Sequence, residues 1–397
     1  MKRNLKHPIA VLGLPLDSLT ADGAIEAIEG LILSEGTHQI ATANLDFWLN
    51  SLSDRHLHRI IAGCSLVLPD GMPLVWVSKL LGCPLAERVT GVDLVPRLAE
   101  LSARKGYGIY LLGGKADVAE RAGKFLQNKF PGTRIVGSYA PSEEEVEQLD
   151  QSKLLERIHA AKPDILLVAL GNPKQEKWIW MHRKRLGVPV AMGVGGSFEI
   201  LVGDMRRAPG WIQRSGLEWA MRFLQEPGRL GPRYLRDFLG LFRNLPLTLL
   251  AGWLQRPYLG SSHVSTVTTT QAMHVYIHGK LSSEVSASLE DASAACIAGS
   301  LVMVVHLNGV RQVTASGLGS LMAVRRTLLD GGLTLSLANL HMKHRFLLHA
   351  WCASPLFDEW ELTMAYGRSM ARDLESAGRV DLRSKQDVLP AQTRVRG

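Results

Sequence analysis

The chain has 397 residues, which is too long for one average domain and favours two. Hydrophobic residues make up 46% of it and charged residues 21%, a composition that excludes a wholly disordered chain. The net charge of +8 leaves three kinds of acidic partner open: nucleic acid, an anionic membrane surface or a phosphate-bearing substrate.

The four cysteines and the N-terminal residues exclude several further classes. The cysteines lie far apart without a CxxC pair, which argues against a disulfide framework and a structural zinc site. The first residues lack the long apolar core of a signal peptide. No uninterrupted run of about 18 apolar residues predicts a membrane-spanning helix. We therefore expect a cytoplasmic protein, and no motif of the chain predicts a metal ion or a cofactor.

Up to residue 194, short apolar runs alternate with amphipathic stretches. The runs that predict strands are Ile9–Leu14, Gln39–Ala43, Ser65–Leu68, Gly108–Leu112, Arg134–Gly137, Ile165–Leu170 and Val188–Val194. The stretches that predict helices are Ile25–Ile32, Leu74–Leu81, Leu94–Arg104, Val118–Lys129, Val146–Ala161 and Glu176–Leu186. This alternation predicts βαβ units and an α/β fold with a mainly parallel sheet.

Three of the predicted strands end in glycine or small polar residues, at positions 111–114, 169–172 and 193–197. Ligands of open α/β sheets bind beyond the carboxyl ends of the strands. We therefore expect these loops to form the site, although a tight turn alone would explain the glycines of any one loop.

Asp70 is the first candidate for chemistry, because it follows a predicted strand between Pro69 and Gly71. Thr42 and Asn44 follow the preceding predicted strand in the same way. A carboxylate held in a rigid turn beside a crevice suits a general base. The alternative for Asp70 is a cap on the helix that follows it.

Two further segments carry candidate binding residues. Arg88 lies beside a Thr-Gly turn and could pair with a phosphate or a substrate carboxylate, or form a surface salt bridge instead. The segment GNPKQEKWIW at 171–180 begins a predicted helix directly after a strand. Its backbone N–H groups favour an anion, and the amides of Asn172 and Gln175 can bind a sugar or uracil. Neither segment matches the phosphate-loop pattern of nucleotide hydrolases.

Residues 204–243 contain eight arginines and four acids, which gives half the net charge of the chain. Arg222, Arg229 and Arg233 lie seven and four residues apart, and their guanidinium groups would suit a diphosphate. The residues that we expect to break a continuous helix here are Pro227, Gly228 and Pro232. We therefore predict an arginine-bearing turn between two helices.

Tryptophan, phenylalanine and leucine accompany these arginines throughout residues 204–259. Basic and apolar residues together predict an element that lies on an anionic membrane surface, and they favour lipid over nucleic acid. The alternative is a buried helix pair whose arginines form internal ion pairs.

The remaining residues predict a linker, a second domain and a tail. Seven serines or threonines in residues 260–271 predict the linker. A smaller α/β alternation follows in residues 272–366. It has strands at Met273–Ile277, Leu301–Leu307 and Leu333–Leu337, and helices at Glu284–Ala298, Gly317–Leu329 and Lys343–Trp351. The tail, residues 367–397, has no aromatic residue and is expected to be disordered.

Taken in order, the motifs of the first domain resemble the WecG/TagA/CpsF glycosyltransferases, glycosyltransferase family 26. The resemblance covers residues 8–245. The motifs are TxN at 42–44, LPDG at 68–71, RVTGxDL at 88–94, LLGG at 111–114, PDILLVALGNPKQEKWI at 163–179, GVGGSFE at 193–199 and RAPxWxxxxGLEWxxRxxxEPxRLxxRY at 207–234.

The resemblance implies a Rossmann-like catalytic domain, residues 1–203, followed by a membrane-proximal appendage, residues 204–259. It also implies metal-independent, inverting transfer from a UDP-sugar to a polyprenyl-diphosphate-linked saccharide at the inner face of the membrane. Asp70 is implied as the base, with Thr42 and Asn44 near the sugars. The implied substrate-binding residues are Arg88, Gly113, Gly114, Gly171, Asn172, Gln175, Glu176, Gly195, Gly196, Arg222, Arg229 and Arg233.

The second domain resembles STAS domains through the segment VTASGLGSLMAVRRTL at 313–328. Ser316 aligns with a serine that is often phosphorylated in that family, but Thr314 and Ala315 replace the residues that precede it there. A partner-binding module, or a helix-capping role for Ser316, are the other readings. The rival to an enzyme is a nucleotide-sugar sensor that signals through this domain.

Overall fold

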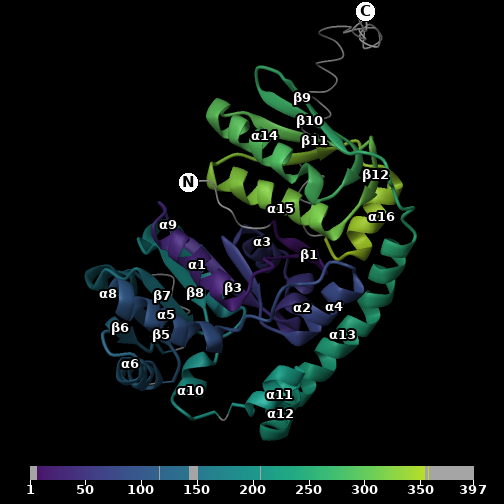
Figure 1. The fold of residues 1–397 in the computed structure, drawn as a ribbon. Helices are drawn as coiled ribbons and strands as arrows, with labels where there is room; N and C mark the ends of the chain where they lie inside the picture. The colour runs from purple at the N-terminus through teal and green to yellow at the C-terminus, as the bar shows by residue number, and fades with distance from the viewer. Residues whose placement is uncertain (1–6, 116, 143–150, 206, 354–355, 357–397) are drawn as a thin grey trace, which may run out of the picture.

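The structure is a computed structural model that describes residues 7–115, 117–142, 151–205, 207–353 and residue 356. The side chains at 213–215, 222 and 229 are outside this description. The described chain contains two sheet-based parts joined by a long helix (Figure 1). We call residues 7–203 the N-terminal unit and residues 263–353 the C-terminal unit.

The N-terminal unit is built on a six-stranded parallel sheet with the strand order β4-β3-β8-β7-β5-β6. The strands are β3 (His38–Ala43), β4 (Leu66–Pro69), β5 (Gly108–Gly113), β6 (Arg134–Tyr139), β7 (Ile165–Ala169) and β8 (Val190–Gly193). All but the first of the seven predicted strands are present in it, so the predicted α/β fold with a parallel sheet is confirmed.

Helices cover both faces of this sheet, because strand side chains alternate between two cores. Ile109 and Leu111 join the first core, and Tyr110 and Leu112 join the second. The first face is covered by α1 (Ala21–Ile32), α5 (Gly91–Lys105) and α6 (Val118–Lys129). The other face is covered by α2 (Leu45–Ser53), α3 (Arg55–Gly63), α4 (Met72–Leu80), α8 (Ser152–Ala161) and α9 (Lys174–Leu186). Residues 146–150 of the predicted helix Val146–Ala161 are outside the description.

The first predicted strand is wrong in its placement. Residues Ile9–Leu14 were expected to join the parallel sheet. Instead β1 (Ile9–Val11) and β2 (Leu14–Leu16) form a separate antiparallel hairpin. Leu12 and Gly13 have φ values of 51° and 79°, the backbone conformation of a two-residue hairpin turn. An apolar run without polar interruption concealed this turn.

Three helices connect the units after α10 (Ser197–Leu201): α11 (Gly210–Ser215), α12 (Glu218–Gln225) and α13 (Pro227–Trp253). The predicted turn between two helices lies at Glu226, between α12 and α13, but the predicted breaks at Gly228 and Pro232 are wrong, since α13 continues through both. Pro227 occupies the first turn, where its missing N–H is not needed, and Pro232 removes a single hydrogen bond one turn later. In the described chain, every helix is too short or too polar to cross a membrane.

The C-terminal unit has a five-stranded sheet in which β12-β10-β11-β13 run parallel and β9 pairs antiparallel with β10. Its strands are β9 (His263–Thr268), β10 (Ala272–Leu281), β11 (Val302–His306), β12 (Val310–Val313) and β13 (Leu335–Ala338). Its helices are α14 (Ser286–Gly299), α15 (Ala315–Asp330) and α16 (Met342–Ala350).

Two expectations for this unit differ from the structure. The stretch 260–271 was expected to be a linker, but its central residues form β9. Its valines and threonines favour a β-strand, which the high content of serine and threonine concealed. Ser316 is not the cap of α15, because the Thr314 hydroxyl accepts the capping hydrogen bond from the Gly317 N–H. Residues 357–366 of the predicted second domain and the predicted tail lie outside the described residues.

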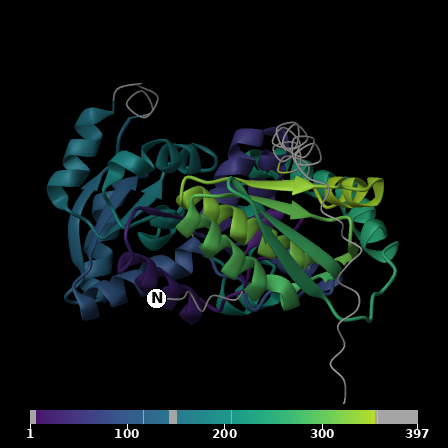
Figure 2. The same ribbon diagram turned by 90° about the horizontal axis from the view of Figure 1, so that it is seen from above.

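The two units pack against each other. From above, the C-terminal unit, green to yellow, covers one end of the N-terminal unit (Figure 2). Ala10 and Ala62 of the N-terminal unit belong to the core of the C-terminal unit. A Cβ atom added to Gly319 of α15 would lie 1.8 Å from the Pro8 carbonyl oxygen, so only glycine permits this contact.

Candidate active site

A cavity of about 600 Å³ lies beyond the carboxyl ends of the sheet strands. The loops after β3, β4, β7 and β8 form its base, and α12 and the first half of α13 form its rim. This is the edge of the sheet at which the sequence placed the site. The pocket combines polar loop residues with apolar side chains of the rim, including Trp219 and Phe238.

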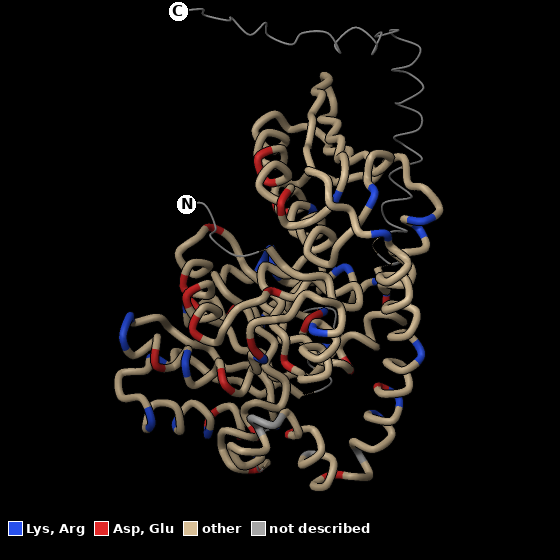
Figure 3. The backbone as a smooth tube through the Cα atoms, turned by 45° about the vertical axis from the view of Figure 1, so that its right-hand side comes forward, with Lys and Arg blue, Asp and Glu red and all other residues tan. Residues whose placement is uncertain are grey.

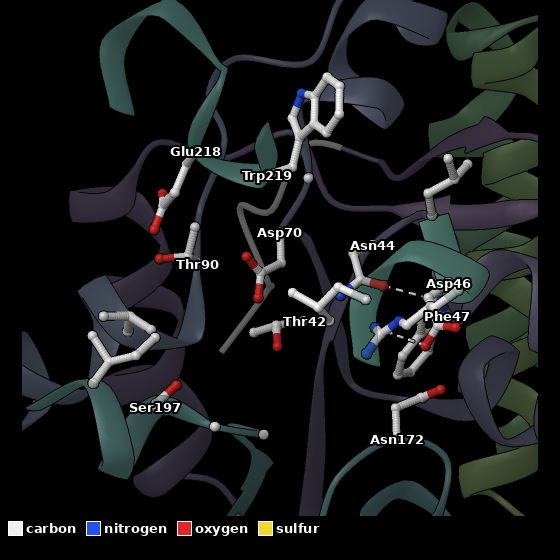
Figure 4. A pocket seen from close by; sticks show the side chains of 18 of the residues that line it. Thr42, Asn44, Asp46, Phe47, Asp70, Thr90, Asn172, Ser197, Glu218 and Trp219 are labelled. Carbon is white, nitrogen blue, oxygen red and sulfur yellow. Dashed lines mark hydrogen bonds and ion pairs between the residues drawn. The ribbon is translucent and has the colours of Figure 1, made fainter. Parts of the chain in front are cut away.

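Asp70 lies in the pocket directly after β4. Its backbone N–H donates to the Ala43 carbonyl oxygen (2.8 Å), which fixes the residue beside the end of β3. The N-cap of α4 is Gly71 and not Asp70, so Asp70 does not occupy the capping position that the sequence left as an alternative. Figure 4 shows the carboxylate pointing into the pocket, with Thr42 beside it and Glu218 toward the rim.

Thr42 and Asn44 bring polar atoms to the same place from the end of β3. The Thr42 hydroxyl donates to the Gly193 carbonyl oxygen (3.3 Å), which ties β3 to β8. The Asn44 side chain caps α2 by accepting from the Phe47 N–H (3.0 Å). Both residues line the pocket, so the structure places them with Asp70 as the sequence predicted.

Residues at the starts of α2, α4, α5 and α9 line this cavity, among them Asn44, Gly71, Thr90 and Gln175. Each helix carries a partial positive charge at its N-terminus and presents free backbone N–H groups there. Their convergence favours an anionic ligand in the pocket.

The loops after β7 and β8 place five predicted residues at the pocket. These residues are Gly171, Asn172, Gln175, Gly195 and Gly196. Gln175 is almost fully buried, and its amide oxygen accepts from the Gly195 N–H (3.0 Å). In this structure Gln175 therefore shapes the glycine loop through a direct hydrogen bond.

Glu176, Gly113 and Gly114 stand behind the pocket rather than in its lining. The buried Glu176 carboxyl group accepts hydrogen bonds from the side-chain amides of Asn172 (3.0 Å) and Gln175 (2.6 Å). Burial raises the pKa of Glu176 to about 7, against the opposing effect of these two bonds. Gly113 lies against the backbone of Ala169, where an added Cβ would approach the carbonyl oxygen to 2.5 Å. These three residues support the loops that form the pocket.

Arg88 connects the base of the pocket to its rim. One guanidinium nitrogen donates to the Glu218 carboxylate at the start of α12 (2.8 Å), and both residues line the pocket. The salt bridge that the sequence left as an alternative is therefore present, but in a largely buried position rather than at the surface. Arg207 lies 3.8 Å from the other oxygen of Glu218 and pairs with Asp93 (2.5 Å).

Arg233 reaches the pocket from α13, where it forms an ion pair with Asp46 of α2 (2.8 Å). Arg236 pairs with the second carboxylate oxygen of Asp46 (2.5 Å). Asp237 adjoins them, and burial together with the nearby Asp46 charge raises its pKa to about 6. Arg222 and Arg229 fall on α12 and α13, but their side chains are outside the described part of the structure. Figure 3 shows that basic residues recur along this side of the molecule.

Sequence reasoning missed the acids of this rim, and it assigned Trp219 to a membrane surface rather than to the pocket. Asp46, Glu218 and Asp237 are buried partners of arginines, and Trp219 lines the pocket beside them. Asp46 stands inside the motif TANLDFW, two residues after Asn44, which was a usable signal. Nothing in the sequence pattern indicated which arginine each acid would meet.

The fold and this pocket indicate an α/β enzyme with a polar site beyond the carboxyl ends of its parallel strands. Within the described residues, no group of three or more His, Cys, Asp or Glu side chains is arranged to hold a metal ion. The profile of the "Glycosyl transferase WecG/TagA/CpsF family" matches residues 9–257, and the chain belongs to that family of glycosyltransferases.

Curated relatives agree with this assignment. The N-acetylglucosaminyldiphosphoundecaprenol N-acetyl-beta-D-mannosaminyltransferase of Bacillus spizizenii is 34% identical over 190 residues, which are 48% of this chain and 72% of the relative. The enzyme with the same name from Staphylococcus aureus is 30% identical over 232 residues, 58% of this chain and 89% of the relative. The C-terminal unit follows the residues matched by the family profile.

Proposed function

We propose that this glycosyltransferase moves a sugar from a UDP-sugar to a polyprenyl-diphosphate-linked saccharide in surface polysaccharide biosynthesis, with inversion and without a metal ion. The names of the relatives favour N-acetylmannosamine as the sugar. Its uronic acid and glucose are the other donors to test. The observation that carries the proposal is the carboxylate of Asp70 in a pocket that is lined by the starts of α2, α4, α5 and α9.

Asp70 acts as the general base in this proposal. Its carboxylate takes the proton from the acceptor hydroxyl while that oxygen attacks the anomeric carbon of the donor sugar. The bond between the anomeric carbon and the UDP phosphate oxygen breaks on the opposite face, and UDP leaves with the electron pair. Attack opposite to the leaving group inverts the anomeric centre. Asp70 then releases its proton to water.

The negative charge that develops on UDP is stabilised by groups already present around the pocket. Helix N-termini supply backbone N–H groups and partial positive charge. Arg88 and Arg233 line the pocket and add full charges. Both are held by carboxylates of neighbouring helices, so they need little reorganisation during the reaction. Arg222 and Arg229 belong to the same proposal as further ligands of a diphosphate.

The first half of α13 also offers a surface for peripheral membrane contact. Leu235, Leu239 and Phe242 are 62%, 59% and 69% exposed and follow one another at helical spacing. Leu250 and Trp253 continue the same stripe toward the C-terminal unit. Their spacing supports an apolar helix face that rests on the membrane holding the lipid-linked acceptor. We place the protein at the inner face of that membrane.

The membrane contact has a direct test in sedimentation with vesicles that contain anionic lipid. We expect Leu239→Glu to lower the bound fraction severalfold, because it places a charge at the centre of the stripe. Leu33→Glu is the matched control, since Leu33 is 74% exposed at the end of α1, outside the stripe. Equal binding of both variants would refute this role of α13.

The domain division belongs to the same proposal. Residues 1–203 form the Rossmann-like transferase domain, and residues 204–259 form its membrane-proximal appendage. Residues 272–366 form a STAS-like domain with the capacity to bind a protein partner. The parallel sheet with α14 and α15 packed on it supports the STAS-like assignment. Strand β9, which precedes residue 272, adds to the same sheet.

The transferase proposal is tested by UDP release from a panel of UDP-sugars, with a short-chain polyprenyl-diphosphate saccharide as acceptor and EDTA present. We expect release that depends on the acceptor and is greatest with UDP-N-acetylmannosamine. Product stereochemistry, read by NMR, checks inversion. Loss of all activity in EDTA with recovery on adding Mg²⁺ would contradict the metal-free mechanism.

A further inference from the structure

Arg326 of the C-terminal unit is buried in the N-terminal unit. It lies in α15 and is 7% exposed. One guanidinium nitrogen donates to the Cys64 carbonyl oxygen (2.6 Å) and lies 3.9 Å from the Asp17 carboxylate. Cys64 precedes β4 by two residues. A cation from the second unit therefore contacts the chain where the strand leading to Asp70 begins.

Asp17 in turn holds the open edge of β4. This strand is at the end of the six-stranded sheet, so one side of it lacks a neighbouring strand. Asp17, which follows β2, makes the hydrogen bonds with Val67 that a neighbouring strand would make. Its N–H donates to the Val67 carbonyl (2.8 Å), and its carboxylate accepts from the Val67 N–H (2.7 Å). Arg326 thus contacts both the start of β4 and the residue that pins its edge.

The position of Asp70 depends on this strand. Val67 precedes Asp70 by three residues, roughly 10 Å of extended chain. On its inner side, the end of β4 is tied to β3 by the bond between the Asp70 N–H and the Ala43 carbonyl. On its outer side, Asp17 and, through it, Arg326 hold Val67, and the Val89 N–H donates to the Pro69 carbonyl oxygen (2.8 Å). Removing the anchor at Val67 leaves the bond from Val89 to hold the outer side of the strand.

The same unit also holds the base of α13. The Thr248 hydroxyl donates to the Ala350 carbonyl at the end of α16 (2.7 Å), and the indole N–H of Trp351 donates to the Thr248 carbonyl (3.2 Å). Gln255, just beyond α13, accepts from the Val313 N–H of β12 (2.8 Å). The C-terminal unit therefore contacts both the strand that carries Asp70 and the helix that carries Arg233.

We propose that the C-terminal unit is a positioning part of the transferase, in which Arg326 and Asp17 hold β4 so that Asp70 meets the acceptor hydroxyl. Both are positioning residues, since neither lines the pocket. The inference rests on the proposed role of Asp70 in transfer. It extends that role to a unit outside the residues matched by the family profile.

The first arm of the test measures turnover in the full-length protein. In Arg326→Met we expect kcat to fall about tenfold, because misplacement of a reacting group by about 1 Å can cost 100-fold. The KM for the UDP-sugar should stay within about twofold, since the arginines and the α9 start proposed to bind UDP do not depend on the anchor at Val67. Arg326→Lys keeps the charge and one donor, so it should recover part of kcat. Thr327→Ala is the control, because Thr327 is an exposed neighbour on α15.

The second arm measures amide hydrogen exchange in peptides that cover residues 64–72, without substrate. We expect exchange there to rise about threefold or more in Arg326→Met, with peptides of α9 and the Thr327→Ala protein unchanged. Asp17→Asn keeps an oxygen for the Val67 N–H but removes the charge, and should show the same two effects in weaker form. This variant serves as the test if Arg326→Met does not fold.

The two arms separate this inference from the assignment of Asp70. Wild-type kcat, or unchanged exchange in residues 64–72, in Arg326→Met or its substitute would overturn the positioning role. Full turnover by Asp70→Asn would instead overturn the base, and the exchange arm would still decide whether Arg326 holds β4. Faster exchange throughout the N-terminal unit would also overturn the proposal, since it would show general destabilisation.

Discussion

Asp46 joins α2 to the rim of the pocket through ion pairs with α13. Removing its charge tests how much these ion pairs stabilise the protein. Its carboxylate is 9% exposed and pairs with Arg233 (2.8 Å) and Arg236 (2.5 Å). Replacing Asp46 by asparagine keeps the shape of the side chain and removes the charge. α13 then loses its two ion pairs to α2.

The expected loss of stability follows from the exposure of the partners. Removing one member of a fully buried ion pair costs about 3–5 kcal/mol, and an exposed pair contributes about 0–1 kcal/mol. Asp46 is buried, but the side chains of Arg233 and Arg236 are 38% and 53% exposed and stay hydrated. Relief of the repulsion with Asp237 offsets part of the loss. We expect a decrease of about 1–2 kcal/mol in the free energy of unfolding.

Urea denaturation at neutral pH measures this change, with Asp22→Asn as the matched control. Asp22 also pairs with an arginine, Arg97, but its side chain is 85% exposed. The control should change stability by at most about 0.5 kcal/mol. In the UDP-release assay, Asp46→Asn should raise the KM for the acceptor, because Arg233 is no longer fixed. Equal stability of the two variants would refute the reasoning.

Three further predictions concern single positions. Burial raises the pKa of Asp237 from 3.8 to about 6 in the folded protein. Between about pH 4 and pH 6 the unfolded chain loses this proton before the folded chain does, so the stability that protonated Asp237 provides is lost as the pH rises. Asp237→Asn should therefore be more stable relative to wild type at pH 8 than at pH 4, by up to about 3 kcal/mol in urea titrations; an unchanged difference would contradict the pKa shift. Gly193→Ala should abolish UDP release, because an added Cβ would lie 2.5 Å from the nearest side-chain atom of α9, whereas Gly30→Ala, with open space around it, should be active. Gly319→Ala should lower the urea midpoint strongly through its clash with Pro8, and a midpoint equal to that of Gly30→Ala would show that the two units are not packed as described.

Much of the N-terminal fold followed from local patterns, because buried parallel strands read as apolar runs and the helices between them are amphipathic. The hairpin β1–β2 and the helices α2 and α3 could not be predicted from these patterns. The hairpin turn contains no Asn-Gly or Asp-Gly signal. The two helices begin at the side-chain caps Asn44 and Asp54, but each helix has only nine residues, which gives little helical periodicity to recognise.

The site could be predicted as far as the residues that follow strands. Thr42, Asn44 and Asp70 meet because the ends of neighbouring parallel strands meet, which topology determines. The ion pairs of Arg88 and Arg233 could not be predicted, since each joins residues more than a hundred positions apart. The positions of Glu176 and Gly113 behind the lining likewise depend on packing between elements, which periodicity does not report.

The measurement that tests the account most directly compares Asp70→Asn with wild type in turnover and in UDP binding. Single-turnover transfer to the lipid-linked acceptor should fall by about 100-fold to 10,000-fold, which is the range for loss of a general base. Calorimetry with UDP should give affinities within about threefold, because the helix N-termini and arginines that surround the pocket are unchanged. Transfer by Asp70→Asn at the wild-type rate would contradict the central claim that this carboxylate activates the acceptor.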